Sequence, residues 1–517
     1  MKALRTLIAG SVLAGLSLAA AAAEGPYDLA IAGARIVDGS GNPWYRGDVY
    51  LKGDTIAVID IAGRKFESKH TIDGRGLVVA PGFIDIHTHA RRAILEIPTA
   101  ENYARQGVTT LIEGPDGGSP VPLRPYLEQV GAVKTSVNFG AFIGQGSIRE
   151  SVIGPNDRKA TPEELTRMLE ITRQGMRDGA FGLSTGLFYV PGTFTPTEEV
   201  TALAKVAGEM GGIHISHMRN EAKDVVKSVN ETVAIGENGA LPTQVTHHKI
   251  IGKGNWSASD QTLAAVAAAR ARGVDATIDQ YPYTASSTGI NALLPAWAQD
   301  GGRQATLTRL KDPETRAKIK AVVVDNIKFD RGGGDPKNIQ IASAGFDPTL
   351  AGKNLAQVTA ARGLEVTFEN AADTALDIIE KGGASAIFHA INEEDLVRIL
   401  RDPNSMVASD GEVIRFGVAA PHPRGYGTFV RVLGRYVREL KVITLQDAIR
   451  KMTSFPAQRL GLLDRGLVRP GMKADLVIFD ENEIGDRATF EKPHQYAVGV
   501  KWVLVSGEVI FDGKSMT

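Results

Sequence analysis

The sequence predicts a parallel (β/α)8 barrel, TIM-like in type, with a small β-sandwich domain built from both ends of the chain. Short apolar runs alternate with helix-like stretches through the central part of the sequence, which is typical of a parallel α/β barrel. Strand-like alternation stands near both ends. The chain has 517 residues, 43% of them hydrophobic, so it can bury a core larger than one average domain provides.

The first 23 residues are typical of a secretory signal peptide cut near Ala23. Lys2 and Arg5 precede an apolar run, 7–18, and alanines occupy 19–23. An ordinary N-terminal helix is the alternative, but the small-residue end and the strand-like segment after it favour export. We therefore expect a periplasmic or secreted protein. No later window has about twenty uninterrupted apolar residues, so we expect no membrane span in the mature chain.

Charge and cysteine content narrow the function further. The 58 Lys and Arg residues nearly balance the 59 Asp and Glu residues, so no basic field exists to bind nucleic acid. The chain has no cysteine, which excludes disulfides and a lipid-anchored Cys. Stability must then come from the core and from any bound metal.

Strand-like segments at the two ends predict one small β-domain with the large domain inserted between its halves. They cover 27–38 and 48–59 at one end, and 474–480 and 500–507 at the other. We expect the two parts of the β-domain at 24–80 and 461–517, and the barrel at 81–460.

Nine apolar runs compete for the eight strand positions of the barrel, so one of them lies outside it. They are Gly82–Ile86, Val108–Ile112, Val137–Ile143, Ala180–Leu183, Gly212–Ser216, Thr243–Thr246, Val274–Ile278, Ala384–Phe388 and Met406–Ser409. Thr161, Pro162 and Glu164 predict a helix start with a capping box. A less regular stretch near 286–347 indicates an insertion over the barrel mouth.

The strongest chemical signal is His87-Thr88-His89, directly after the apolar run Gly82–Ile86. Side chains two residues apart on an extended strand point to the same face, so both imidazoles can bind one metal ion. A lone His-x-His is weak evidence, since histidines are common in cores and on surfaces. Its place at a strand end strengthens it, because barrel enzymes place their chemistry there.

His217 and His247 each close another apolar strand. His214 is three residues from His217, so it points to the other strand face and is interpreted as structural. His247 is preferred to His248 because it extends the strand. Asp410 follows the run Met406–Ser409; alone it would be interpreted as a helix N-cap, but with the four histidines it completes a metal-binding pattern.

These motifs resemble the amidohydrolase superfamily and, more closely, the N-acyl-D-amino-acid deacylase (D-aminoacylase) family. The broader resemblance lies in Pro81–His89, His217, His247, Asp410 and Gly471–Leu476. The closer one lies in Gly182–Leu187, His217–Glu221, Thr246–Lys249, Tyr281–Tyr283, Ser409–Gly411, Pro421–Arg424 and Ser454–Ala457. The motifs span essentially the whole mature chain.

The resemblance implies a buried metal ion held by His87, His89 and Asp410, and a more exposed one held by His217 and His247. That family often has a Cys ligand after the second strand, and here two carboxylates compete for its place. Asp116 matches by counting, whereas Glu113 lies on the strand and has the longer reach. Either is a suitable bridge between two divalent ions, and we favour Glu113.

The resemblance also implies that Lys249, Tyr283 and Arg424 bind the carboxylate of the substrate, for which cations and a hydroxyl are suited. Alone, Lys249 would be interpreted as a solvated surface charge. Arg219 and Glu221 are weaker candidates and are interpreted as an ion pair. After His89 the sequence has Ala90-Arg91-Arg92 where that family leads us to expect acidic residues, which puts substrate preference in doubt.

The implied function is hydrolysis of the amide bond of N-acyl amino acids, in particular N-acyl-D-amino acids. One or two divalent ions, Zn²⁺ first among them, would activate a water molecule, with Asp410 as general base and acid. The expected partner is a small N-acyl amino acid or a dipeptide-like molecule.

Three alternatives remain open at this point. A dipeptidase or cyclic-amide hydrolase would share the barrel and the metal ligands. A catalytically inactive barrel acting as a binding protein would be free to lose those ligands, yet all are present. A periplasmic solute-binding protein would need two similar α/β lobes. A metal assay separates the enzyme from the last two classes.

Overall fold

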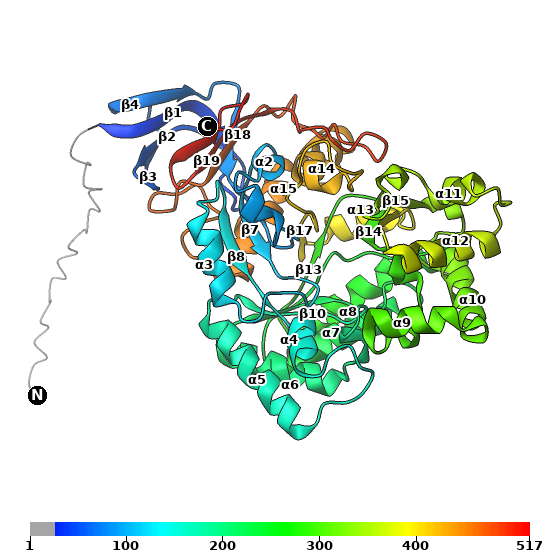
Figure 1. Cartoon of the computed structure of the whole chain (residues 1–517). Helices are drawn as coiled ribbons and strands as arrows, with labels where there is room; N and C mark the ends of the chain where they lie inside the picture. Colours follow the sequence, from blue (N-terminus) through cyan, green and yellow to red (C-terminus); the bar gives the residue numbers. More distant parts are fainter. Residues whose placement is uncertain (1–25) are drawn as a thin grey trace, which may run out of the picture.

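The computed structural model describes residues 26–517 of the chain (Figure 1). The predicted signal peptide, residues 1–23, lies outside the described residues. Within 26–517, no helix combines the length and the apolar character needed to cross a membrane.

The two ends of the chain join in one eight-stranded sheet, drawn in blue and red in Figure 1. The order is β20-β19-β18-β5-β1-β2-β3, with β4 paired to β1. The ends meet where β18 runs antiparallel to β5, with Val477 opposite Ala80. The strands are β1 (Tyr27–Ile36), β2 (Tyr45–Lys52), β3 (Thr55–Asp60), β4 (Ser68–Asp73), β5 (Val78–Pro81), β18 (Leu476–Phe479), β19 (Val500–Val505) and β20 (Glu508–Phe511).

The barrel is made of parallel strands whose neighbours in space are also neighbours in the chain, except at its closure. β8 and β9 follow one another and count as one, so eight strands form it. They are β6 (Phe83–Asp85), β7 (Val108–Glu113), β8 (Asn138–Ala141) with β9 (Ile143–Gly144), β10 (Gly182–Gly186), β11 (Ile213–His217), β12 (Thr243–Val245), β13 (Ala276–Gln280) and β17 (Ser405–Val407).

The barrel closes between the end of β6 and the end of β17. Asp410 N donates to His87 O at 2.9 Å, and His89 N donates to Gly411 O at 2.7 Å. A parallel bridge between Thr88 and Gly411 lies in the same place. The last hydrogen bonds of the barrel are therefore made by the backbone of residues predicted to carry the chemistry.

Ala384–Phe388 is the one candidate run that does not enter the barrel. It forms β16 (Ser385–Phe388), the centre of an antiparallel sheet with β14 (Ser286–Gly289) and β15 (Ile339–Ser343). This sheet and its helices have their own apolar core, from Ile290 to Phe388, so β16 is as buried as a barrel strand. The inserted unit, at the right of Figure 1, therefore continues past residue 347.

Helices separate most barrel strands, as the alternation predicts. Thr161 caps α5 with the predicted capping box: Glu164 N donates to Thr161 Oγ1 at 3.2 Å and Thr161 N donates to Glu164 Oε2 at 2.9 Å. The barrel helices are α1 (Ala93–Glu96), α2 (Glu101–Ala104), α3 (Arg124–Ala132), α4 (Gln145–Val152), α5 (Pro162–Arg177), α6 (Thr197–Glu209), α7 (Val225–Gly239), α8 (Ser259–Ala271), α13 (Glu393–Arg401), α14 (Arg424–Arg431), α15 (Leu445–Met452) and α16 (Ser454–Arg459). The inserted unit contains α9 (Gly302–Lys311), α10 (Pro313–Phe329), α11 (Leu355–Ala361) and α12 (Phe368–Lys381).

His214 is a structural link between neighbouring barrel strands. Its Nε2 lies 3.0 Å from Thr185 Oγ1 on β10, and its Nδ1 lies 2.8 Å from Thr243 Oγ1 on β12. Complete burial lowers the pKa of His214 from 6.5 to about 3. The ring is therefore neutral in the folded protein at every pH where the protein is expected to work.

His214 should make the protein less stable as the pH falls. The unfolded chain takes up a proton near pH 6.5 but the folded one does not until about pH 3, so stability is lost as the pH falls through this window. The loss is up to about 1.4 kcal/mol per pH unit. We expect His214→Gln to give a shallower fall of Tm between pH 7 and pH 5 than the unmodified protein. The exposed His70 of β4 provides the control, and equal slopes for His214→Gln and His70→Gln would contradict this assignment.

Candidate metal centre

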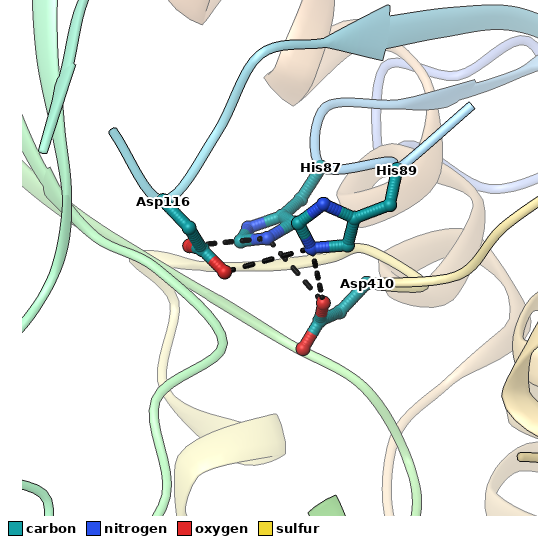
Figure 2. A group of neighbouring side chains, drawn as sticks. All are labelled: His87, His89, Asp116 and Asp410. Atoms are coloured by element: carbon teal, nitrogen blue, oxygen red, sulfur yellow. Dashed lines mark hydrogen bonds and ion pairs between the residues drawn. The ribbon is translucent and has the colours of Figure 1, made fainter. Parts of the chain in front are cut away.

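Asp116 is shared by two groups of side chains whose ligand atoms lie within 4.8 Å of one another. Figure 2 shows one group, in which Asp116 faces two histidine rings. The first group is His87, His89, Asp116 and Asp410, and the second is Asp116, His217 and His247. All six residues were predicted as candidate ligands from the sequence.

Each carboxylate oxygen of Asp116 faces one histidine of each group. Oδ1 lies 3.4 Å from His87 Nε2 and 3.3 Å from His247 Nε2. Oδ2 lies 3.5 Å from His89 Nε2 and 3.5 Å from His217 Nδ1. This is the arrangement expected of a carboxylate that bridges two cations.

Asp410 lies on the other side of the first group. Its Oδ1 is 3.0 Å from His89 Nε2 and 3.5 Å from His87 Nε2, while Arg424 Nη1 donates to its Oδ2 at 2.7 Å. Burial opposes ionisation of this carboxyl, but Arg424 and His87 outweigh it and hold the pKa of Asp410 below its usual range. Asp410 is therefore an ionised carboxylate, as a metal ligand or a general base must be.

A buried carboxylate, Asp85, orients the strand ends that carry this group. Its Oδ1 accepts hydrogen bonds from Ser409 N at 3.0 Å and His87 N at 3.2 Å, so it ties β6 to the end of β17. Burial raises the pKa of Asp85 to about 7. Asp410, the residue after Ser409, has a left-handed backbone conformation with φ of 52°. This conformation is strained for a residue with a side chain.

Asp279, on β13, orients the second group. Its Oδ1 accepts from His247 N at 2.7 Å and its Oδ2 from Gln244 Nε2 at 2.5 Å. His248 points elsewhere, with Nε2 at 2.7 Å from Thr262 Oγ1. The structure thus places His247, the histidine preferred from the sequence, in the centre.

Glu113 is not in either group, so our preference for Glu113 over Asp116 is wrong. Its Oε2 accepts from Arg91 N at 3.0 Å and its Oε1 from Arg91 Nε at 3.1 Å. Arg91 is part of the stretch after His89 where we expected acidic residues. Arg91 therefore binds the Glu113 carboxylate that the sequence favoured as a metal ligand.

Close packing of glycines brings Asp116 back over the barrel mouth. Asp116 and Gly117 both have positive φ, 57° and 72°. A Cβ on Gly186, at the end of β10, would lie 2.1 Å from Asp116 O, and one on Gly144 would lie 2.4 Å from Gly117 O. Only residues without a side chain let the loop rest directly on the strand ends.

Lys249 is buried behind the second group rather than solvated. Its Nζ forms an ion pair with Glu221 and donates to His247 O at 2.7 Å. Glu221 Oε1 is also 3.2 Å from His247 Nδ1, and Arg331 Nη2 donates to Glu221 Oε2 at 3.3 Å. The pair expected between Arg219 and Glu221 is wrong, because Arg219 binds Glu231 at 2.9 Å.

Tyr281, not the predicted Tyr283, lies between the two predicted cations. Its ring centroid is 5.6 Å from Lys249 Nζ and 4.9 Å from Arg424 Cζ. Its hydroxyl is buried and has no hydrogen-bond partner within residues 26–517. Tyr283 donates to Pro423 O at 3.4 Å, and neither tyrosine is part of the lining of the central cavity. The sequence could have indicated Tyr281 by its position, because it directly follows the strand that carries Asp279.

Several of these side chains line a central cavity of about 260 Å³. Its polar lining includes His89, Asp116, His217, Glu221, His247, Lys249, Ser286, Arg331, Asp410, Glu412 and Arg424. A larger hollow of about 730 Å³ borders the inserted unit and contains none of the predicted site residues. The chemistry therefore belongs to the smaller, more polar cavity.

The residues present suit divalent ions. His87 Nε2 and Asp116 Oδ1 are buried and have no hydrogen-bond partner among residues 26–517. His217 Nδ1 and His247 Nε2 lie 2.7 Å apart, so both nitrogens are close enough to serve one site. Burial lowers the pKa of His217 to about 4; burial and Lys249 oppose protonation of His247, but Asp116 and Glu221 raise its pKa to about 9. Imidazoles and carboxylates are the ligands that zinc and similar ions prefer.

The fold and the site together define a (β/α)8 barrel with a histidine and carboxylate centre at the carboxyl ends of its strands. The model of the Amidohydrolase family matches residues 70–511. D-aminoacylase from Alcaligenes xylosoxydans xylosoxydans is 33% identical over 95% of this chain and 96% of its own length. The chain belongs to the amidohydrolase family and, within it, to the D-aminoacylase family, as its motifs predict.

Two solved structures agree with this placement. A D-aminoacylase described with a binuclear metal center has a TM-score of 0.80 and 32% identity, covering 95% of this chain and 98% of that one. The N-acyl-D-glutamate deacylase of Bordetella bronchiseptica, complexed with zinc and a phosphonate inhibitor, has a TM-score of 0.80 and 33% identity over the same shares.

Asp116 and Glu113 should differ in their effect on metal content. Asp116→Asn removes the charge shared by both groups, so the affinity for metal should fall by roughly tenfold or more. Elemental analysis of the folded protein should then find less bound metal. Glu113→Gln changes only the contact with Arg91 and should keep its metal. Full metal content in Asp116→Asn, with metal lost from Glu113→Gln, would reverse the assignment.

Proposed function

We propose that the protein hydrolyses the amide bond of N-acyl-D-amino acids with one or two zinc ions at the Asp116 centre. The observation that carries this proposal is the position of Asp116, with each oxygen 3.3–3.5 Å from one histidine of each group. The relatives support the substrate class, since they are named for removing acyl groups from D-amino acids. We also propose that the chain is exported, which N-terminal sequencing of the mature protein would test.

The metal would be held by His87, His89 and Asp410 on one side and by His217 and His247 on the other, with Asp116 between them. Divalent ions bound there polarise the scissile carbonyl and acidify a water molecule. The zinc and the phosphonate of the Bordetella bronchiseptica deacylase, described as a mimic of the tetrahedral intermediate, support water addition as the reaction type.

Asp410 is suited to move the proton. It is an ionised carboxylate whose Oδ2 is fixed by Arg424, so its Oδ1 faces the histidines and the cavity. Asp410 accepts the proton of the attacking water and delivers it to the nitrogen of the leaving amine, which departs as the amino acid. Arg424 keeps the carboxylate in one orientation through both steps.

The α-carboxylate of the substrate is assigned to Lys249, Tyr281 and Arg424. Tyr281 lies between the two cations, and its free hydroxyl can donate to an anion. Tyr281 takes the role that the sequence motif assigned to Tyr283. A substrate without this carboxylate cannot make these contacts with the two cations and the hydroxyl.

A panel of substrates tests the function directly. We expect the zinc-loaded protein to release the amino acid from N-acetyl-D-leucine faster than from N-acetyl-L-leucine, a dipeptide or a hydantoin. Chelation should abolish the activity and added zinc should restore it. A dipeptide or cyclic amide as the best substrate would replace the proposed activity with the alternatives from the same superfamily, and activity that survives complete metal removal would exclude the metal mechanism.

Asp410 and Tyr281 should affect catalysis in different ways. Asp410→Asn keeps the size of the side chain but removes the proton acceptor, so kcat should fall by about a hundredfold or more. Tyr281→Phe removes only a hydroxyl facing the carboxylate, so KM should rise while kcat changes little.

Tyr283→Phe is the matched control, because Tyr283 carries the same hydroxyl two residues away but directs it to Pro423 O. We expect its steady-state constants to stay close to those of the unmodified protein. A KM effect as large in Tyr283→Phe as in Tyr281→Phe would return the recognition role to the motif position first predicted.

A further inference from the structure

Arg331 is a buried cation of the central cavity that the reaction described above does not use. It follows α10 in the inserted unit, is 3% exposed, and stacks on Phe188 with its Cζ 4.1 Å from the ring centroid. Its Nη2 donates to Glu221 at 3.3 Å, and its buried Nε has no hydrogen-bond partner among the described residues. A buried guanidinium with a free donor at the wall of a cavity is suited to bind an anion.

The charges around Arg331 do not balance. In the described part of the chain, Lys249 and Arg331 both pair with Glu221 and with no other carboxylate. The neighbouring Asp330 forms no ion pair with Arg331 there, and burial raises the pKa of Asp330, which disfavours its charged form. Two cations therefore share one carboxylate at this corner, and a buried charge is costly unless it has a partner.

Arg331 shares Glu221 with Lys249, but it contacts a different aromatic ring from the residues assigned to the α-carboxylate. Lys249 and Arg424 both contact the ring of Tyr281, whereas Arg331 contacts Phe188. Phe188 also lines a neighbouring chamber of about 380 Å³. Ser286 lines the central cavity, and its buried Oγ likewise has no hydrogen-bond partner in the part of the chain that the structure describes. The cavity thus offers polar donors beyond those that one carboxylate can use.

We propose that Arg331 binds a second carboxylate of the substrate, so that doubly acidic N-acyl amino acids are preferred to their neutral counterparts. The second carboxylate belongs either to the amino-acid side chain or to the acyl group, and the chemistry recognised is the same. This proposal rests on the proposed function, because it needs an N-acyl amino acid in the cavity.

The test compares acidic substrates with neutral ones of matched size. N-acetyl-D-glutamate against N-acetyl-D-glutamine places the second carboxylate in the side chain, and N-succinyl-D-leucine against N-butyryl-D-leucine places it in the acyl group. We expect the unmodified protein to prefer the acidic member of one pair. Arg331→Met should lower kcat/KM for that member by roughly tenfold to a hundredfold, as for the loss of a charge-assisted hydrogen bond, and change the neutral member much less.

Two variants separate recognition from a structural role. Arg331→Lys keeps the charge and should restore part of the preference. Arg303→Met carries the same substitution at an exposed arginine of the inserted unit that contacts only Ile379 O and Glu380 O, so it should leave all four substrates unchanged. Metal content and Tm of each variant show whether the centre and the fold are intact.

Equal losses on the acidic and neutral members of both pairs would show that Arg331 only holds Glu221, and would overturn the proposal. So would an unmodified protein that prefers the neutral member of both pairs. If the unmodified protein cleaves none of the four substrates, the proposed function fails and this inference fails with it. Cleavage of all four without an effect of Arg331→Met on preference overturns the second-carboxylate site alone.

Discussion

The barrel closes through the same backbone that carries the metal-binding side chains. The hydrogen bonds from Asp410 N to His87 O and from His89 N to Gly411 O join β6 to the segment after β17 and form the seam of the barrel. Asp85 holds this seam from below by accepting from Ser409 N and His87 N. A shift of the seam by one residue would turn the alternating side chains to the other face and remove both imidazoles from the centre. Closing the barrel therefore also aligns the metal-binding side chains.

Asp116 depends on this seam, although it belongs to neither strand. It comes from a loop that rests on Gly144 and Gly186, at the ends of the next strands around the barrel. With a fixed loop on one side and a fixed seam on the other, one carboxylate is shared by four histidines from three different strands or strand ends. The arrangement agrees with the general rule that a (β/α)8 barrel builds its site from several strands.

Strand order and the histidine ligands could be predicted because they follow local patterns. Apolar runs ending in His89, His217, His247 and Asp410 identify strand ends without any knowledge of the fold. The choice between Glu113 and Asp116 could not be made this way, because it depends on a left-handed turn and on Arg91. Tyr281 and Tyr283 are two residues apart, so on an extended chain both side chains would point to the same side. The path of the backbone after β13 determines which of them lies between Lys249 and Arg424. β16 resembles a barrel strand in sequence because a second core buries it equally well.

The joint between β5 and β18 sets an order of events in the synthesis of the protein. These strands pair along their whole lengths, yet about 400 residues of chain lie between them. At roughly 5–20 residues per second, a ribosome needs roughly 20–80 seconds to cover that distance. During this time β5 has an open edge, a feature that favours pairing with other chains. The first domain to begin is thus the last to be finished, and the nascent chain has to be kept from self-association until its final segment emerges.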